Sequence, residues 1–160
     1  MTITLTINGH TGTYEIDPGE KLLDLLRREG HMGVKKGCGS GDCGACAVLL
    51  DGRAVNSCLI FAAKVDGCEI VTAEGLSDGE TLHPVQEAFL DEGAVQCGYC
   101  TPGMMISTVD LLTRNPDPTE EEIREGLSGN LCRCTGYVKQ IRAVQRAAEA
   151  MRGGDRNDRA

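Results

Sequence analysis

Residues 37–46 read Gly-Cys-Gly-Ser-Gly-Asp-Cys-Gly-Ala-Cys, so three cysteines share one short loop. A fourth cysteine follows after eleven further residues. A backbone that wraps several thiolates around metal must turn tightly, often with positive φ, and glycine adopts that conformation without a clash from Cβ. Backbone N–H groups in such a loop can also donate to sulfur and stabilise an anionic cluster. The stretch therefore predicts a metal centre held by Cys38, Cys43, Cys46 and Cys58.

The spacing of these cysteines indicates the kind of metal centre. The pattern C-x4-C-x2-C followed by a distant cysteine is typical of plant-type [2Fe–2S] ferredoxins. A structural zinc site is the alternative, but zinc prefers two C-x2–4-C pairs separated by a longer loop. Because three of the four cysteines lie in one glycine-rich loop, the spacing favours a first [2Fe–2S] cluster.

A second set of four cysteines lies in the C-terminal half of the chain. A C-x-x-C motif taken alone is ambiguous, because it also marks thiol–disulfide exchange sites. A C-x-C motif follows between two predicted helices, and antiparallel helices would bring it back beside the first pair. We expect a second [2Fe–2S] cluster, with zinc and a redox dithiol as the alternatives. Its predicted ligands are Cys97, Cys100, Cys132 and Cys134.

The hydrophobic pattern changes near residue 75. Before it, apolar residues alternate with polar ones, as Ile3, Leu5 and Ile7 do, which predicts β-strands. After it, the period becomes that of a helix, and Thr119 with Glu122 forms a capping box. The expected fold class is therefore α+β. The predicted strands cover residues 2–7, 13–16, 46–50, 53–57 and 69–72, and the predicted helices cover 20–28, 82–90, 102–113, 120–127 and 137–151.

The same change of period predicts a domain boundary. We expect one domain over residues 1–76, which holds the first cluster, and a helical domain over residues 77–152, which holds the second. Residues 153–160 contain no apolar side chain before the terminal alanine. That composition predicts a disordered tail.

Composition limits the compartment and the partners. The N-terminus lacks the basic and apolar regions of a secretory signal, and no apolar run is long enough to span a membrane, so we expect a cytoplasmic protein. The chain has nine cysteines, and in a reducing cytosol paired cysteines at short spacings favour metal ligation over disulfides. The net charge of −8 argues against a general nucleic-acid binder, which needs a basic surface.

Two longer strings in the C-terminal half carry a resemblance to a known family. They are Gln96-Cys97-Gly98-Tyr99-Cys100-Thr101-Pro102-Gly103-Met104 and Gly129-Asn130-Leu131-Cys132-Arg133-Cys134-Thr135-Gly136-Tyr137. Both resemble the iron–sulfur subunits and domains of the molybdenum hydroxylases, the family of xanthine dehydrogenase, aldehyde oxidoreductase, carbon monoxide dehydrogenase and 4-hydroxybenzoyl-CoA reductase. The loop over residues 37–46 is also similar, and the match covers nearly the whole chain.

The resemblance implies a β-grasp plant-type ferredoxin domain followed by a four-helix bundle, each with one [2Fe–2S] cluster. It implies a large partner subunit that binds a molybdenum–pterin cofactor and a medium subunit that binds FAD, together a heterotrimer or its dimer. This chain would then be an electron-transfer subunit that is inactive toward substrate alone. Of its residues, the resemblance places Gln96 and Cys134 near the pterin. Because this chain has no room for flavin or molybdenum domains, we expect both on partners.

The sequence leaves two alternatives to an electron-transfer subunit open. A stand-alone ferredoxin-type carrier would need only the residues up to about 75, and a zinc-stabilised interaction module would hold no iron. The remaining candidate ligands have simpler expected roles. We expect Cys68 to be a small buried apolar residue, and His31 and His83 to serve at helix caps or on the surface. Paired carboxylates suited to acid–base catalysis do not stand out.

Overall fold

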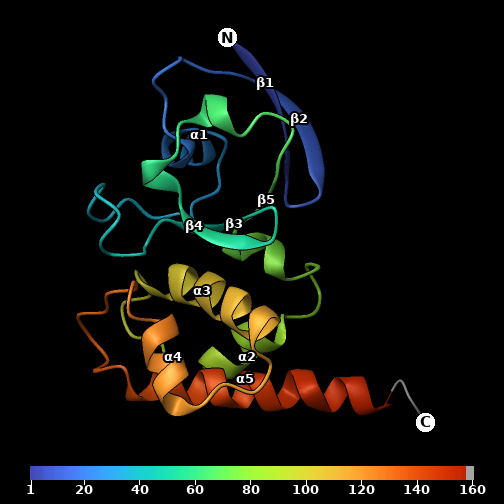
Figure 1. The fold of residues 1–160 in the computed structure, drawn as a ribbon, viewed down its shortest axis with the longest axis vertical. Coiled ribbons are helices and arrows are strands. Elements are labelled where there is room, and N and C mark those ends of the chain that lie inside the picture. The colour runs from blue at the N-terminus through green and yellow to red at the C-terminus, as the bar shows by residue number, and fades with distance from the viewer. Residues whose placement is uncertain (158–160) are drawn as a thin grey trace.

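A five-stranded mixed sheet forms the N-terminal half of the computed structural model, which describes residues 1–157 (Figure 1). The strand order is β2-β1-β5-β3-β4. Strand β1 pairs in parallel with β5, and the other neighbouring strands pair antiparallel. The strands are β1 (Thr2–Ile7), β2 (His10–Glu15), β3 (Ala47–Leu50), β4 (Arg53–Asn56) and β5 (Glu69–Val71).

Both hairpins of the sheet close on two residues with positive φ. Asn8 and Gly9 have φ of 50° and 80°, and Asp51 and Gly52 have φ of 48° and 80°. Turns of this kind match the right-handed twist of the strands that they join, which is why Asn-Gly and Asp-Gly are strong hairpin signals. The tight first turn pairs Ile7 directly with His10. Strand β2 therefore begins three residues before the predicted start at residue 13.

Helix α1 (Leu22–Arg28) covers one face of this sheet. It buries Leu22, Leu23, Leu25 and Leu26, and these side chains pack with Ile3, Leu5 and Ile7 of β1. Burying a Leu or Ile side chain fully is worth about 1.5–3 kcal/mol, so this cluster is the main support of the N-terminal half. Three short 3-10 helices complete this half: η1 (Ser57–Leu59), η2 (Ala62–Lys64) and η3 (Ala73–Leu76).

The C-terminal half is helical, as predicted. Its helices are α2 (Pro84–Asp91), α3 (Thr101–Arg114), α4 (Glu120–Gly126) and α5 (Val138–Asn157). His83 caps α2, because its side chain accepts a hydrogen bond from the Val85 N–H. Thr119 and Glu122 form the predicted capping box of α4. Phe89, Met104, Ile123 and Val144 are among the fully buried residues of the core that joins the four helices.

Helix α3 lies between the sheet and the other helices (Figure 1). Strand β3 alternates its side chains accordingly. Val48 points into the core beneath α1, whereas Ala47 and Leu49 pack with Ile106 of α3 on the other face. The sheet is therefore buried on both faces at β3, and the two halves share an apolar contact.

The C-terminal end of α5 differs from the sequence prediction. The helix continues to Asn157, over the first part of the segment 153–160 for which disorder was predicted, and residues 158–160 lie outside the described range. The guanidinium of Arg152 pairs with the Asp117 carboxylate and donates to the Pro116 carbonyl at 2.9 Å. This contact joins α5, just before Gly153, to the segment between α3 and α4. No helix in the described range is long and apolar enough to cross a membrane.

Candidate metal centres

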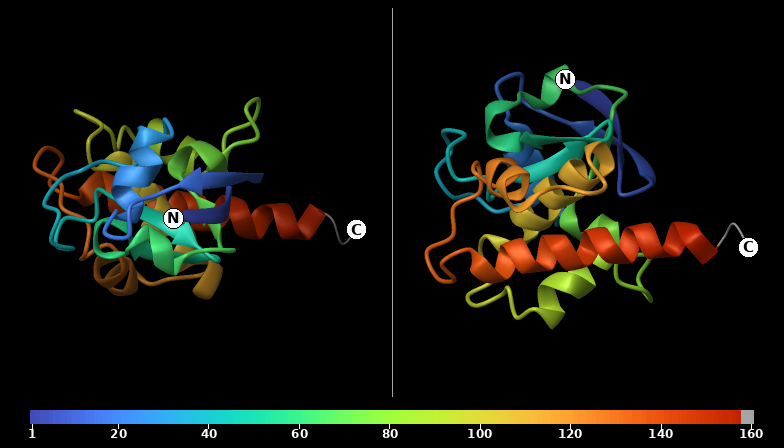
Figure 2. Two further views of the ribbon diagram at one scale, coloured as in Figure 1. Left: turned by 90° about the horizontal axis from the view of Figure 1, so that it is seen from above. Right: turned by 60° about the horizontal axis from the view of Figure 1, so that its bottom comes forward.

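The loops that carry the predicted ligands lie at one side of the molecule. Residues 37–46, the segment between α2 and α3, and the segment between α4 and α5 all project away from the C-terminal end of α5, and the three views agree on this (Figures 1 and 2). The fold thus gathers cysteines that are far apart in the sequence. These segments are the expected sites of metal binding.

The first loop surrounds the Cys38 sulfur with backbone donors. Its Sγ atom accepts from the N–H groups of Ser40 at 3.4 Å, Asp42 at 3.3 Å and Cys43 at 3.4 Å. Gly39 and Gly41 make this possible, because their φ angles of 73° and 87° turn successive N–H groups inward. Hydrogen bonds from Ser40, with a smaller contribution from Cys43, lower the pKa of the Cys38 thiol to about 6. The loop stabilises the thiolate, which is the form that binds metal.

The other cysteines of the first set lie deeper. The Cys43 sulfur accepts from the Cys38 N–H at 3.3 Å, while Cys46 and Cys58 are buried at 3% and 5% exposure. Burial raises the pKa of the Cys46 thiol to about 11. A bound metal offsets this cost by holding the thiolate form. The donors and the all-thiol set of side chains fit an iron–sulfur cluster.

The second set comes together as the sequence predicted. The Sγ atoms of Cys97 and Cys134 are 3.5 Å apart, although 37 positions separate the residues. Burial raises the pKa of the Cys100 thiol to about 12, with a smaller contribution from the neighbouring Cys132 side chain. Burial also acts against ionisation of Cys132, but hydrogen bonds from the Thr135 side chain and from the Cys134 and Thr135 backbones together outweigh it and lower the pKa of Cys132 to about 7. The C-x-C motif therefore faces the C-x-x-C motif.

The cysteines of the second set associate in pairs. Cys97 contacts Cys134, and Cys100 contacts Cys132. In the part of the chain that the structure describes, no three Cys, His, Asp or Glu side chains converge on one point. A tetrahedral zinc site needs four ligands around one ion, whereas a [2Fe–2S] cluster takes two thiolates on each of two irons. The arrangement in pairs fits the cluster better.

Hydrogen bonds join the first cysteine loop, residues 37–46, to the loop that carries the C-x-C motif. The Leu131 N–H, beside Cys132, donates to the Cys43 carbonyl at 2.9 Å, and the Asn130 side chain donates to the Gly44 carbonyl at 3.3 Å. Gly103, in the first turn of α3, packs so closely against the first loop that a Cβ added there would be 2.2 Å from the Gly44 carbonyl oxygen. The sequence patterns did not predict this contact. The glycines inside the cysteine motifs were the one feature of the sequence that could have indicated it.

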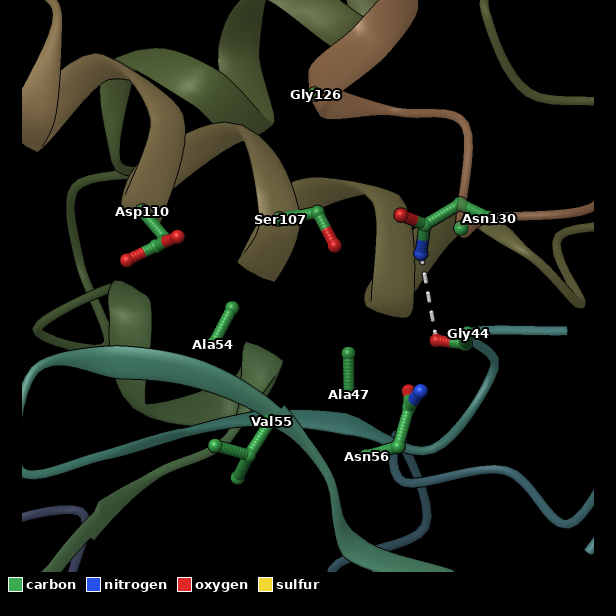
Figure 3. Close-up of a pocket in the computed structure, with 10 residues that line it drawn as sticks. Gly44, Ala47, Ala54, Val55, Asn56, Ser107, Asp110, Gly126 and Asn130 are labelled. Atoms are coloured by element: carbon green, nitrogen blue, oxygen red, sulfur yellow. Dashed lines mark hydrogen bonds between the residues drawn. The ribbon is translucent and has the colours of Figure 1, made fainter. Parts of the chain in front are cut away.

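A cavity of about 200 Å³ lies beside this contact, between strands β3 and β4 and helix α3 (Figure 3). Its lining is polar at Asn56, Ser107, Asp110 and Asn130. The Asp110 carboxylate joins the two halves at one side of the cavity, since it pairs with Arg53 of β4 at 3.0 Å and with Arg114 of α3 at 2.9 Å. No cysteine lines the described cavity, although its lining includes Gly44 of the first loop and Asn56, whose Oδ1 atom is 3.9 Å from the Cys46 sulfur.

The remaining predicted residues fall into surface and core. Gln96 is exposed and directly precedes Cys97, which is also exposed, as is Cys134. Cys68 packs against the core beneath α1 but is only half-buried, so it is less buried than the sequence predicted. His83 caps a helix, in agreement with its expected role.

Comparison with known proteins agrees with this geometry. A model of the 2Fe-2S iron-sulfur cluster binding domain matches residues 5–74, and a model of the [2Fe-2S] binding domain matches residues 72–145. The nicotinate dehydrogenase small FeS subunit of Eubacterium barkeri is 48% identical over 150 residues, which is 93% of this chain and 96% of that protein. The xanthine dehydrogenase iron-sulfur-binding subunit of Escherichia coli O157:H7 is 49% identical over 146 residues, 90% of this chain and 92% of that one.

Solved structures show the same architecture. A chain of quinoline 2-oxidoreductase from Pseudomonas putida 86 superposes with a TM-score of 0.92 at 46% identity, over 96% of this chain and 97% of that chain. Aldehyde oxidoreductase from Desulfovibrio gigas superposes with a TM-score of 0.91 at 41% identity, over 96% of this chain and 17% of that much longer one. The chain belongs to the family of small iron–sulfur subunits of the molybdenum hydroxylases, with two [2Fe–2S]-binding domains.

Proposed function

We propose that this chain passes electrons one at a time from the molybdenum–pterin site of a large subunit to a flavin subunit or an external acceptor. A bound [2Fe–2S] cluster supplies the one-electron chemistry that this role needs. The first cluster is held by Cys38, Cys43, Cys46 and Cys58 in a domain over residues 1–76, and the second by Cys97, Cys100, Cys132 and Cys134 in a domain over residues 77–152.

The observation that supports this function most directly is the junction between the two cysteine loops. Cys43 of the first set accepts a hydrogen bond from Leu131, the neighbour of Cys132 in the second set, at 2.9 Å. Gly44 lets the two backbones approach closely, because a Cβ at this position would be 2.4 Å from the Gly129 carbonyl oxygen. A stand-alone ferredoxin-type carrier would need one cluster, and it would not need a second cysteine loop fixed to the first.

The surface around the second set suits a large partner. Cys97 and Cys134 are exposed, and Tyr99 and Leu131 are large apolar side chains that are 47% and 55% exposed. Side chains of this kind are favoured in the buried centre of protein interfaces. We place the molybdenum–pterin subunit on this face, with Gln96 and Cys134 nearest the pterin. A medium FAD subunit completes a heterotrimer or its dimer.

The first test is metal content. The complex isolated with its native partners should yield four irons and four acid-labile sulfides per copy of this chain, and two EPR signals after reduction, because two sets of four cysteines are present. Stoichiometric zinc, or two irons only, would contradict the assignment.

The second test is kinetic. In a Cys134→Ser complex, substrate should still reduce molybdenum in a rapid-mixing experiment, whereas steady-state turnover should collapse because electrons cannot leave. Cys68→Ala, which changes a cysteine outside both sets, is the matched control and should turn over normally. Normal turnover in a complex whose second cluster is shown to be absent would refute the proposed route.

A further inference from the structure

Thr135 and Gln140 lie beside the sulfur of Cys132. The Thr135 hydroxyl oxygen is 3.1 Å from Cys132 Sγ, and Gln140 Nε2 is 2.6 Å from that hydroxyl and 4.0 Å from the same sulfur. Thr135 belongs to the loop between α4 and α5, and Gln140 belongs to the first turn of α5. The function described above assigns neither side chain a role.

The hydrogen bonds fix the direction in which Thr135 donates. Its oxygen receives the Gln140 amide proton at 2.6 Å and the Tyr137 backbone proton at 3.4 Å. Both of those nitrogens can only donate, so the threonine oxygen acts as the acceptor in each bond. The single hydroxyl proton is then left for the sulfur of Cys132.

The orientation of the Gln140 amide is fixed in a similar way. Its nitrogen lies 3.2 Å from the Ala94 carbonyl oxygen, which can only accept, so the amide nitrogen rather than the oxygen must face that group. Gln140 is fully buried, and its Oε1 atom has no hydrogen-bond partner among the described atoms. An unpaired buried acceptor destabilises a fold. Packing alone would therefore favour an apolar side chain here.

We propose that Thr135 and Gln140 raise the reduction potential of the second centre. Thr135 donates to the Cys132 thiolate, and Gln140 is a positioning residue that holds the Thr135 proton on the sulfur. This inference rests on the proposed function, in which Cys132 is a ligand. Reduction adds one electron to the centre and increases the negative charge on its sulfurs. A donor to a ligand sulfur stabilises that state more than the oxidised state.

The test is a redox titration of the assembled complex, followed through the EPR signal of each centre. Thr135→Val keeps the shape of the side chain and removes the donor. It should lower the reduction equilibrium constant of the second centre about tenfold, or ~59 mV for a one-electron couple. Thr135→Ser keeps the hydroxyl and should keep the potential. The first centre serves as an internal reference in every sample.

Two further variants separate tuning from structure. Gln140→Met removes the donor to Thr135 and should shift the potential in the same direction by less, because the threonine hydroxyl remains. Thr108→Val is the matched control, since that buried hydroxyl donates only to the Met104 carbonyl, at 2.8 Å. It should affect stability and leave both potentials unchanged.

Each result decides one question. An intact second signal with an unchanged potential in Thr135→Val would overturn the inference and leave the proposed function standing. If Thr135→Val fails to assemble, an unchanged potential in Gln140→Met overturns it instead. A wild-type complex without a second EPR signal would refute the ligand assignment, and with it the proposed function.

Discussion

Replacing Gly103 by alanine tests whether the close packing of helix α3 against the first cysteine loop determines stability. Gly103 lies in the first turn of α3, where alanine is normally better than glycine by up to about 1 kcal/mol. Helix propensity alone therefore predicts a more stable protein. The added Cβ, however, would be 2.2 Å from the Gly44 carbonyl oxygen and 3.3 Å from the Ala45 Cα atom, which are both backbone atoms.

The steric term should outweigh the helix propensity. The two backbones must separate by about 1 Å to relieve the overlap, since carbon and oxygen atoms are in contact at roughly 3.3 Å. That movement weakens the hydrogen bond from Leu131 to Cys43 and the one from Asn130 to Gly44, each worth about 1 kcal/mol net. Overpacking adds about 1–3 kcal/mol. After the gain in helix propensity is subtracted, Gly103→Ala should destabilise the protein by about 2–4 kcal/mol.

The assay is thermal unfolding of the cluster-loaded protein. For a chain of this size, each kcal/mol shifts Tm by roughly 2–4 °C, so Gly103→Ala should lower Tm by about 4–16 °C. Gly153→Ala is the matched control. Gly153 is also helical, and a Cβ there meets nothing within 4 Å, so that variant should keep or slightly raise Tm. An equal or higher Tm for Gly103→Ala would show that the close packing of α3 against the first cysteine loop has no energetic role.

Three other predictions concern the ligands, the ion pairs and the metal. Cys68→Ala should keep the iron content and both EPR signals, whereas Cys43→Ala and Cys100→Ala should each abolish one signal; loss of a cluster in Cys68→Ala would show that the cysteines are wrongly grouped. Asp110→Asn should lower Tm by the same amount at about pH 6 and about pH 8. Burial opposes ionisation of Asp110, but Arg114 and Arg53 hold the pKa of its carboxylate below its usual 3.8. The ion pairs therefore stabilise the fold fully above pH 3.8, and this stabilisation is lost only as pH falls through the lower pKa of the folded state. If the difference in Tm between wild type and Asp110→Asn changed between these two pH values, another titrating group would be responsible. Iron removal by a chelator should reduce helical circular dichroism before the strand signal, because the second centre joins the loops between the helices whereas strand pairing joins the strands to one another directly. Intact helicity in the apo chain would contradict this.

Local sequence patterns predicted most of the secondary structure, and failed where tertiary contacts extend an element. The alternation of Ile3, Leu5 and Ile7 located β1, and the Asn-Gly turn located the hairpin. The start of β2 was missed because His10 and Gly12 have weak strand propensity, yet pairing with β1 includes them. The end of α5 was missed because residues 153–157 have no apolar side chain that would show a helical period, yet they continue the helix.

The sequence by itself determined the two sets of cysteines, the change from strand to helix and the family, because these depend on residue type and short spacings. The tertiary structure alone decided how the sets meet. Gly44 and Asn130 are bonded across 86 positions, and no local pattern predicts which loops the chain brings together over such a distance. The donor to Cys132 was also hidden, because Thr135 has a defined direction only when Gln140 and Tyr137 occupy its oxygen. Hydrogen-bond direction depends on three-dimensional placement, and the sequence records only which groups are available to make the bonds.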